Sequence, residues 1–407
     1  MCFKNSVFGG CLMLIAFACW FNAKCGEAFG TFGFDIHHRY SDTVKEYLNL
    51  DGLPEKGTVD YYTAMAHRDQ LLHDRRLAAS TKPVLTFYSS VGNETYYISN
   101  LAYLHYAYLS VGTPSLEFFV ALDTSKDLFW LPCDCTTCAR KFLTQVIIQR
   151  ILIDIFYDIL FSELKKPAFP IYSPSNSTTS KPLPCNSTKC GPTRGCSTMY
   201  NACSYEISYG ATSSTCILVD DVLHLGTNVT PQDVVDVPVT FGCGQNLTGN
   251  FLDVAGINGV FGLGMDNISI PSVLANKGLV ANSFSLCFGS SSSVGRIEFG
   301  DKGSPLQKKT PFNLQQSKPT YNITVTQIAV DNNVTDLVFA ANFDSSVSYS
   351  FFADPAYSFI VNNVLWIWCL DEDVEPPRLL FFVVARARDL RAFECLMYAL
   401  LDACVLA

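Results

Sequence analysis

Two aspartates occupy equivalent places in a pattern that occurs twice along the chain. Asp123 follows an apolar run (116–122) and precedes Thr-Ser, while Asp344 follows a largely apolar run (337–343) and precedes Ser-Ser. A carboxylate at the end of a buried strand is costly unless it is hydrogen-bonded or functional. If the two halves repeat one architecture, both carboxylates meet at a shared interface. Two acids held that close share one proton and suit acid–base chemistry.

The segments around the aspartates predict the strands that must hold them. Before Asp123, residues 106–111 and 116–122 have strand character and are joined by the turn Gly112-Thr-Pro114. Both faces of the second run are apolar, as in a strand that is buried on both sides. Residues 321–330 predict another strand before the second aspartate. Aromatic residues make up 13% of the chain and also favour β structure.

Composition disfavours two classes of protein. With 49% hydrophobic and only 16% charged residues, the 407-residue chain is not largely disordered and can bury a large core. Its formal net charge of −9 disfavours a general nucleic-acid binder. The length suits two or three ordinary domains or one large two-lobed domain.

The N-terminus predicts export. Lys4 supplies a positive charge, residues 7–20 are almost wholly apolar, and small residues follow over 23–28. This layout predicts a signal peptide over residues 1–28, because the apolar stretch is short for a membrane span. A signal anchor is the alternative. We expect a protein of the secretory pathway, outside the cell or at its surface, with no further membrane span.

Glycosylation motifs and cysteines point to the same compartment. Eight Asn-x-Ser/Thr motifs predict a glycoprotein, and 17 cysteines predict disulfides formed in an oxidising environment. The Cys-x-x-Cys spacing of Cys135 and Cys138 also suits zinc or redox chemistry. Disulfides are the expected state, their connectivity stays open, and we expect no metal or other cofactor. The motifs begin at Asn93, Asn176, Asn186, Asn228, Asn246, Asn267, Asn322 and Asn333.

Three segments differ in character from the rest. Residues 29–95 differ in containing His37, His38, Arg39, Arg68, Arg75 and Arg76. These basic side chains suit a propeptide that masks an anionic cleft, with a flexible N-terminal extension as the alternative. Residues 141–161 carry apolar side chains at helical spacing within a region of strand and turn signals. After Gly303 the chain has no glycine, and over 361–407 apolar runs alternate with arginines. We leave this tail unassigned.

Several short motifs occur in a fixed order along the chain. They are Val111-Gly-Thr-Pro114, Leu122-Asp-Thr124, Asp127-Leu-Phe-Trp-Leu-Pro-Cys-Asp-Cys135, Tyr209-Gly210, Asn258-Gly-Val-Phe-Gly-Leu-Gly264, Ile297-Glu-Phe-Gly-Asp301, Phe343-Asp-Ser345 and Asp354-Pro-Ala-Tyr357. Together they resemble the pepsin-type aspartic proteases, most closely the cysteine-rich, nepenthesin-like plant branch. The match covers residues 100–140 and 169–360.

The resemblance implies an all-β, two-lobed pepsin-like acid protease fold. The N-terminal lobe would span residues 96–310, with residues 141–161 as an atypical insert, and an incomplete C-terminal lobe would span 311–360. Asp123 and Asp344 would be the catalytic pair. The ionised carboxylate would act as general base on a water molecule, and the protonated one would polarise the scissile carbonyl.

The resemblance also implies supporting residues around this pair. The hydroxyls of Thr124 and Ser345 would brace the two loops against each other. Tyr209 and Gly210 would belong to a flap that closes over the substrate, and Trp130 would hydrogen-bond the flap tyrosine. The alternatives are an ordinary hairpin for the flap residues and a plain core position for the tryptophan.

The chain departs from the family pattern beside both aspartates. Ser125 and Ser346 stand where the family has glycine, and a side chain there threatens the placement of the carboxylates. Lys126 replaces a small polar residue, and a cation near Asp123 favours its ionised form. Cys216 stands where the family usually has glycine after the flap, and we expect an unpaired thiol there.

These features leave two classes of function open. The first is an aspartic endopeptidase, made as a secreted, glycosylated zymogen, that cleaves extended polypeptides with apolar side chains flanking the cut. The second is a catalytically impaired pepsin-like binding protein or a non-functional variant. In either case we expect a monomer whose partner is a polypeptide and not a nucleic acid.

Overall fold

The structure is a computed structural model. It describes residues 32–48, 61, 65, 86–88, 95–97, 103–135, 138, 169–191, 194–209, 212–226, 234–252, 258–289, 294–307, 309–330, 332–368 and 404–406. The predicted signal peptide, the insert at 141–161, Gly210 and residues 369–403 of the tail lie outside the described residues.

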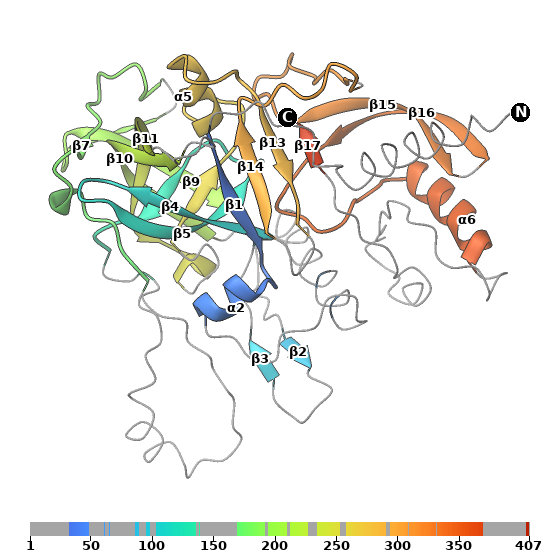
Figure 1. Ribbon diagram of the computed structural model, residues 1–407, viewed down its shortest axis with the longest axis horizontal. Coiled ribbons are helices and arrows are strands. Elements are labelled where there is room, and N and C mark those ends of the chain that lie inside the picture. Colours follow the sequence, from blue (N-terminus) through green and yellow to red (C-terminus); the bar gives the residue numbers. More distant parts are fainter. Residues whose placement is uncertain are drawn as a thin grey trace, which may run out of the picture.

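Strands dominate the described chain, as the sequence predicted (Figure 1). They are β1 (Phe32–His38), β2 (Thr86–Tyr88), β3 (Thr95–Tyr97), β4 (His105–Val111), β5 (Leu116–Asp123), β6 (Trp130–Pro132), β7 (Lys181–Pro182), β8 (Cys196–Ser197), β9 (Ala202–Tyr209), β10 (Thr212–Gly226), β11 (Val234–Leu247), β12 (Val260–Gly262), β13 (Phe284–Cys287), β14 (Gly295–Phe299), β15 (Asn322–Val330), β16 (Asn333–Asn342) and β17 (Cys404–Leu406). The helices are α2 (Asp42–Leu48), α5 (Ile270–Asn276) and α6 (Ala356–Trp368), with short 3-10 turns η1 (Pro174–Asn176) and η2 (Gly249–Leu252).

One 13-stranded sheet forms the body of the described protein. Its strands follow the order β17-β13-β14-β1-β4-β5-β12-β6-β11-β10-β9-β8, and β7 pairs with β10 beside that path. Most neighbours are antiparallel, but β5 with β12 and β6 with β11 are parallel pairs. Two separate two-stranded sheets, β15–β16 and β2–β3, complete the described strands.

The strand β5 is buried because both of its faces are apolar. From Phe118 to Asp123 every residue is buried, in agreement with the expectation of a strand that is covered on both sides. Phe118 and Val120 belong to one hydrophobic cluster, whereas Phe119 and Ala121 belong to another. The alternation of the strand therefore supplies both cores, and it carries Asp123 at its end.

The floor beneath Asp123 is made by β12 and the residues that follow it. Gly262 pairs with Asp123, and the backbone N–H of Leu263 donates to the carbonyl oxygen of Asp123 at 2.9 Å. A Cβ atom added at Gly262 would come within 2.5 Å of the carbonyl carbon of Asp127. Only glycine permits this close approach between β12 and the loop after β5.

Residues of the N-terminal segment 29–95 are built into the sheet. The strand β1 pairs with β14 on one side and with β4 on the other. Phe32 and Ile36 are buried in the main hydrophobic cluster, and Val44 of α2 is buried in the second. Tyr47 of α2 packs its ring at 4.7 Å from that of Phe119. The described part of this segment therefore packs against the body.

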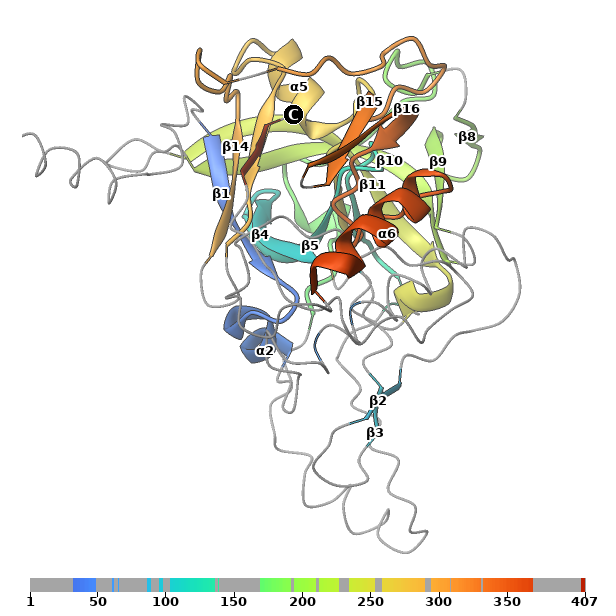
Figure 2. The ribbon, with the colours of Figure 1, turned by 90° about the vertical axis from the view of Figure 1, so that its right-hand side faces the viewer.

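A smaller unit follows the body in sequence. The ribbon β15–β16 pairs in antiparallel register, and α6 lies against it in both ribbon views (Figures 1 and 2). Helix α6 starts within the predicted C-terminal lobe and continues past residue 361, where the tail was expected to begin. At the far end of the chain, β17 pairs with β13.

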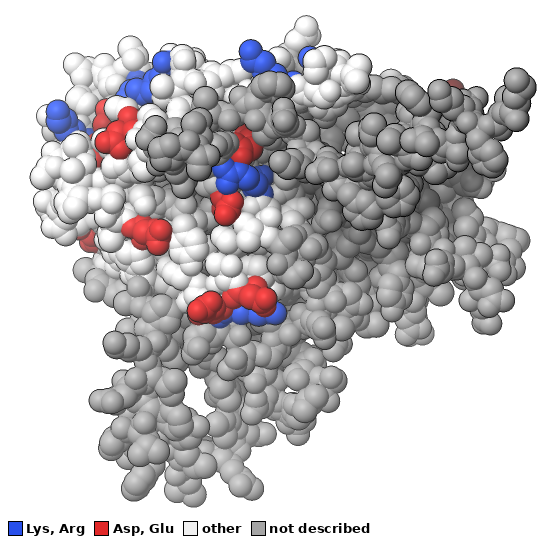
Figure 3. Space-filling model, viewed as in Figure 1, with Lys and Arg blue, Asp and Glu red and all other residues white. Residues whose placement is uncertain are grey.

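Charged side chains of both signs are interspersed on the face shown in Figure 3. Among the described residues, Lys45 pairs with Asp42 at 3.4 Å, and Arg296 pairs with Asp35 at 2.8 Å. None of the helices in the described part of the chain has the length and apolar character needed to cross a bilayer.

Candidate active site

Asp123 is held by its own loop. Its side chain is buried at the end of β5, and the residue is only 2% exposed. The backbone N–H and the hydroxyl of Ser125 both donate to its Oδ1, at 2.8 and 2.7 Å. The serine that replaces the expected glycine therefore fits into the loop, and its hydroxyl becomes a ligand of the carboxylate.

Asp344 is held in the same way in a loop that follows β16. The backbone N–H and the hydroxyl of Ser346 donate to its Oδ1, at 2.8 and 2.6 Å. Asp344 is half-buried, and Ser346 is buried. The two loops thus repeat one local geometry, as the repeated sequence pattern suggested.

Reciprocal hydrogen bonds join the two loops across a sequence separation of 221 residues. The backbone N–H of Thr124 donates to Oγ of Ser345 at 3.2 Å, and the backbone N–H of Ser345 donates to Oγ1 of Thr124 at 2.9 Å. Each hydroxyl follows directly after one of the two aspartates. The exchange therefore holds Asp123 and Asp344 side by side in one site.

The electrostatics of Asp123 reflect this arrangement. Burial, reinforced by the nearby negative charge of Asp344, raises the pKa of Asp123 to about 6. The two hydrogen bonds from Ser125 and the positive charge of Lys126 act in the opposite direction. Burial and the charge of Asp344 outweigh these opposing effects, because the ionised form of Asp123 is poorly solvated and is repelled by a second carboxylate. Asp123 therefore holds a proton under mildly acidic conditions.

Tyr209 lies above this site at the end of β9, in the hairpin that β9 forms with β10. Nε1–H of Trp130 donates to the hydroxyl oxygen of Tyr209 at 3.3 Å. Burial, together with the charge of Asp123, raises the pKa of Tyr209 well above its usual value, so the phenol stays neutral. Its predicted neighbour Gly210 lies outside the described residues.

Three further side chains complete the site, and the sequence motifs did not single them out for this role. Tyr103 is buried just before β4 and hydrogen-bonds Tyr209. Phe251 packs edge-to-face on Trp130 at 4.7 Å and on Tyr209 at 5.2 Å between ring centroids. Lys126 reaches the same tyrosine from the loop of Asp123. Their contacts are long-range, so no local spacing could have revealed them.

Disulfides support the strands around the site. Cys135 and Cys138, which suited a metal or a disulfide, form a disulfide, and Cys133 is bonded to Cys243 between β6 and β11. Two more bonds join Cys185 to Cys196 and Cys190 to Cys203 beside the hairpin. Among the described residues, Cys216 is the free cysteine and is half-buried, and no group of side chains there suits a metal ion.

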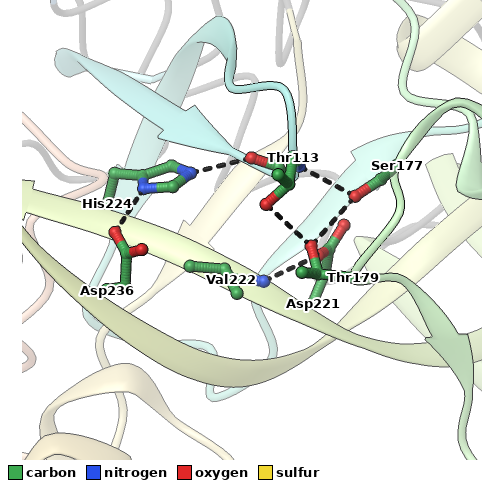
Figure 4. Close-up of polar contacts among 8 residues, drawn as sticks. Thr113, Ser177, Thr179, Asp221, Val222, His224 and Asp236 are labelled. Atoms are coloured by element: carbon green, nitrogen blue, oxygen red, sulfur yellow. Dashed lines mark hydrogen bonds and ion pairs between the residues drawn. The ribbon is translucent and has the colours of Figure 1, made fainter.

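A polar network fixes the turn that leads into β5 (Figure 4). Asp221 is buried on β10 and accepts hydrogen bonds from Tyr172 and Thr179, both at 2.5 Å. The hydroxyl of Thr179 also contacts that of Thr113 at 3.0 Å, and the backbone N–H of Thr113 donates to Ser177 at 2.9 Å. The turn before the strand of Asp123 is therefore tied to β10.

His224 extends the same network on β10. Its Nε2 lies 2.8 Å from the carbonyl oxygen of Gly112, and its Nδ1 lies 2.6 Å from Oδ1 of Asp236 on β11 (Figure 4). Burial alone would lower the pKa of His224, but the hydrogen bonds to Gly112 and Asp236 outweigh it and raise that pKa. The charges of Asp236 and Asp221 act in the same direction. The imidazolium, which donates from both nitrogens, suits this position best.

The chain has extensive similarity to known plant proteins. A family model described as "Xylanase inhibitor N-terminal" matches residues 105–301. Over 363 residues the chain is 49% identical to aspartyl protease family protein 1 of Arabidopsis thaliana, which covers 87% of this chain and 65% of that protein. Over 374 residues it is 32% identical to aspartic proteinase-like protein 1 of the same plant. This match covers 85% of this chain and 67% of that protein. The chain belongs to the plant branch of the pepsin-type aspartic proteases.

This membership confirms the family resemblance and the all-β pepsin-like fold expected from the sequence. The chain spans about two thirds of the length of these two aspartic protease relatives. Among solved structures, conglutin gamma from lupine seeds is similar with a TM-score of 0.45 at 19% identity, over 65% of this chain and 66% of that one.

The raised pKa of Asp123 makes the stability of this protease-family protein depend on pH. Because the folded pKa of about 6 exceeds the unfolded value of 3.8, the protonated group favours folding below about pH 4, and this contribution is lost as the pH rises through 6. Asp123→Asn mimics the protonated group. We expect its Tm to exceed that of the wild type by several degrees at about pH 7 and to equal it at about pH 3.5.

The matched control for this measurement is Asp134→Asn, since Asp134 is exposed. It should leave the Tm unchanged at both pH values. An Asp123→Asn variant that is no more stable than the wild type at neutral pH would contradict the electrostatic description of the site.

The doubly hydrogen-bonded His224 predicts the same sign of pH dependence. Its folded pKa lies above the unfolded 6.5, so its contribution to stability is present below pH 6.5 and is lost as the pH rises through the folded value. His224→Gln should therefore lower the Tm more at about pH 5 than at about pH 9. Thermal melts by circular dichroism at the two pH values test this, and equal losses at both would refute it.

Proposed function

We propose that the protein is an aspartic endopeptidase with Asp123 and Asp344 as its catalytic pair. The observation that carries the proposal is the reciprocal bonding of Thr124 and Ser345, which holds the two aspartate loops together. Two adjacent carboxylates cannot both ionise easily, so the pair retains one proton at acidic pH. The named protease relatives support the same reaction class.

The reaction follows from the shared proton. A water molecule between the carboxylates loses a proton to the ionised one while its oxygen attacks the carbonyl carbon of the peptide. The protonated carboxyl donates a hydrogen bond, and then its proton, to the carbonyl oxygen. In the resulting tetrahedral intermediate, the amide nitrogen takes the proton that the first carboxylate accepted from water. The C–N bond then breaks while one hydroxyl returns a proton to the second carboxylate, which restores the shared proton. The protein forms no covalent bond with the peptide.

The surrounding side chains have supporting roles in this proposal. Thr124 and Ser345 fix the spacing of the carboxylates. Tyr209, with Gly210 beside it in the chain, closes over the bound peptide and excludes water, and Trp130 holds the tyrosine in place. The aromatic rings beside Asp123 favour a polypeptide substrate with apolar side chains next to the cut.

The processing of the chain is part of the same proposal. Residues 1–28 would direct export, and the multiple disulfides of the described chain suit an oxidising compartment. Residues 29–95 would act as the propeptide of a zymogen, 96–310 as the N-terminal lobe and 311–360 as part of the C-terminal lobe. We propose that the folded product is a monomeric glycoprotein of the secretory pathway.

Hydrolysis of a quenched fluorescent peptide library at about pH 4 tests the activity directly. We expect Asp123→Ala and Asp344→Ala each to reduce kcat/KM by at least about a thousandfold, because each removes one half of the acid–base pair. Asp134→Asn is the control and should cleave like the wild type, because the position is exposed and asparagine tolerates its left-handed backbone. Cleavage that survives either active-site change, or no cleavage by folded wild type, would contradict the proposal.

A second candidate, a catalytically impaired binding protein, is favoured by the two serines beside the aspartates. The hydroxyl of Ser125 donates to Asp123 and lowers its pKa, which opposes sharing of the proton. Ser346 contacts Asp344 in the same way. Under this candidate the wild type binds peptides without cleaving them.

Restoring glycine at both positions separates the two candidates. If the serines abolish turnover, the double variant Ser125→Gly, Ser346→Gly should gain at least about tenfold in kcat/KM over an inactive wild type. For the working protease that we favour, we expect a change of less than about threefold and an optimum shifted to higher pH, since the hydroxyl donor of Ser125, one of the groups that lower the pKa of Asp123, is gone. A large gain would replace our proposal with the second candidate.

A further inference from the structure

Lys126 lies three residues after Asp123, and its backbone is fixed to the floor of the site. Its carbonyl oxygen accepts a hydrogen bond from the backbone N–H of Gly264 at 2.8 Å, just beyond β12. The next residue, Asp127, accepts from the N–H of Asp266 at 2.9 Å. The base of the lysine side chain is therefore anchored on the rigid part of the sheet.

The side chain of Lys126 leaves this anchor and reaches the end of β9. Its Nζ donates to the carbonyl oxygen of Ser208 at 3.3 Å and lies 4.9 Å from the centre of the Tyr209 ring. An ammonium group at that distance over a tyrosine face is attracted by the ring. The lysine is half-buried. One side chain thus contacts both the backbone and the ring at the tip of the strand.

These contacts join the loop after Asp123 to the tip of the hairpin formed by β9 and β10. Trp130 and Tyr103 hold Tyr209 by its hydroxyl, at the far end of the ring. Lys126 holds it by its face and by the preceding carbonyl group. Together the three contacts restrain the tyrosine from both ends above Asp123.

We propose that Lys126 is a positioning residue that latches the tip of β9, through Ser208 and Tyr209, over the Asp123 loop. The inference rests on the proposed function, because it concerns how this site holds its substrate. The latch keeps Tyr209 in the closed position before a peptide arrives, so that less binding energy is spent on ordering the hairpin.

The latch also places a positive charge near the acid–base pair. The groups that face Asp123 are Asp344 from the second loop, Lys126 from its own loop, and the phenols of Tyr209 and Tyr103. Both phenols stay neutral because burial raises their pKa values. Removing the ammonium leaves the repulsion of Asp344 less opposed. Loss of a proton from the pair then requires a higher pH.

Kinetics of three single variants of the full chain test the latch. Lys126→Met keeps the length of the side chain but removes the charge, and Lys126→Arg retains both a donor and a cation over the ring. We expect Lys126→Met to raise KM at least about fivefold with kcat changed less than about twofold, and to shift the pH profile up by about half a unit. Lys126→Arg should recover most of the wild-type KM and pH profile.

The matched control is Lys277→Met, which removes one positive charge from an exposed position after α5. It should leave KM and the pH profile unchanged. A Lys126→Met variant with wild-type KM, or a Lys126→Arg variant as impaired as Lys126→Met, would overturn the latch.

Hydrogen exchange separates failure of the latch from failure of the proposed function, because it needs no turnover. In Lys126→Met, the amides of residues 202–209 and 212–217 should exchange at least about fivefold faster than in the wild type, and those of β5 should not change. Faster exchange in a protein without peptidase activity supports the latch and rejects the endopeptidase. Unchanged exchange in an active enzyme rejects the latch alone.

Discussion

Two carboxylates lie close together in this protein, and most of the contacts around them serve to hold them there. Asp123 and Asp344 repel each other when both are ionised, and burial of Asp123 adds to the cost. The protein meets this cost locally, because each carboxylate accepts two hydrogen bonds from the serine two residues further on. The reciprocal hydrogen bonds between Thr124 and Ser345 also oppose separation of the two loops.

The sheet explains why these bonds are possible at all. Asp123 lies at the base of the site because β5, which carries it, is buried on both faces. The parallel strand β12 packs beside β5, and glycine at position 262 leaves room for the loop that follows Asp123. The turn before β5 is tied to β10 by Asp221 and His224. The hairpin that carries Tyr209 is formed by β9 and this same strand β10. The position of the Asp123 loop and that of Tyr209 therefore rest on a common support.

The strands and both aspartate loops could be predicted from sequence because their signals are local. The expected strand at 106–111 is observed as β4, and the expected strand at 321–330 is observed as β15. Repetition of one short pattern identified Asp123 and Asp344 as equivalent before any geometry was known. The family motifs also predicted a hydrogen bond between Trp130 and Tyr209. It is present at 3.3 Å and joins residues 79 positions apart.

The remaining features depend on contacts that sequence spacing does not encode. Tyr103 is one tyrosine among 19, and nothing nearby in the chain distinguishes it from a core residue. The pairing of the cysteines was open for the same reason. Ser125 and Ser346 were expected to threaten the placement of the carboxylates, because the sequence cannot show that a hydroxyl has room to turn toward Oδ1. The reach of Lys126 to β9 depends on a fold in which residues 82 positions apart become neighbours.

The place of β1 in the sheet limits how the N-terminal segment could be removed. Among the described strands, β1 is the one that links β14, and with it β13 and β17, to β4 and the half of the sheet that carries Asp123. Cutting the chain after α2 would sever the covalent connection between β1 and the rest of the sheet. The backbone hydrogen bonds of β1 with β14 and β4 would stay in place. Departure of the cut piece would split the sheet and leave two strand edges open to solvent or to another chain. Release of the N-terminal segment is therefore a strand-exchange problem, in which a replacement strand must fill the gap.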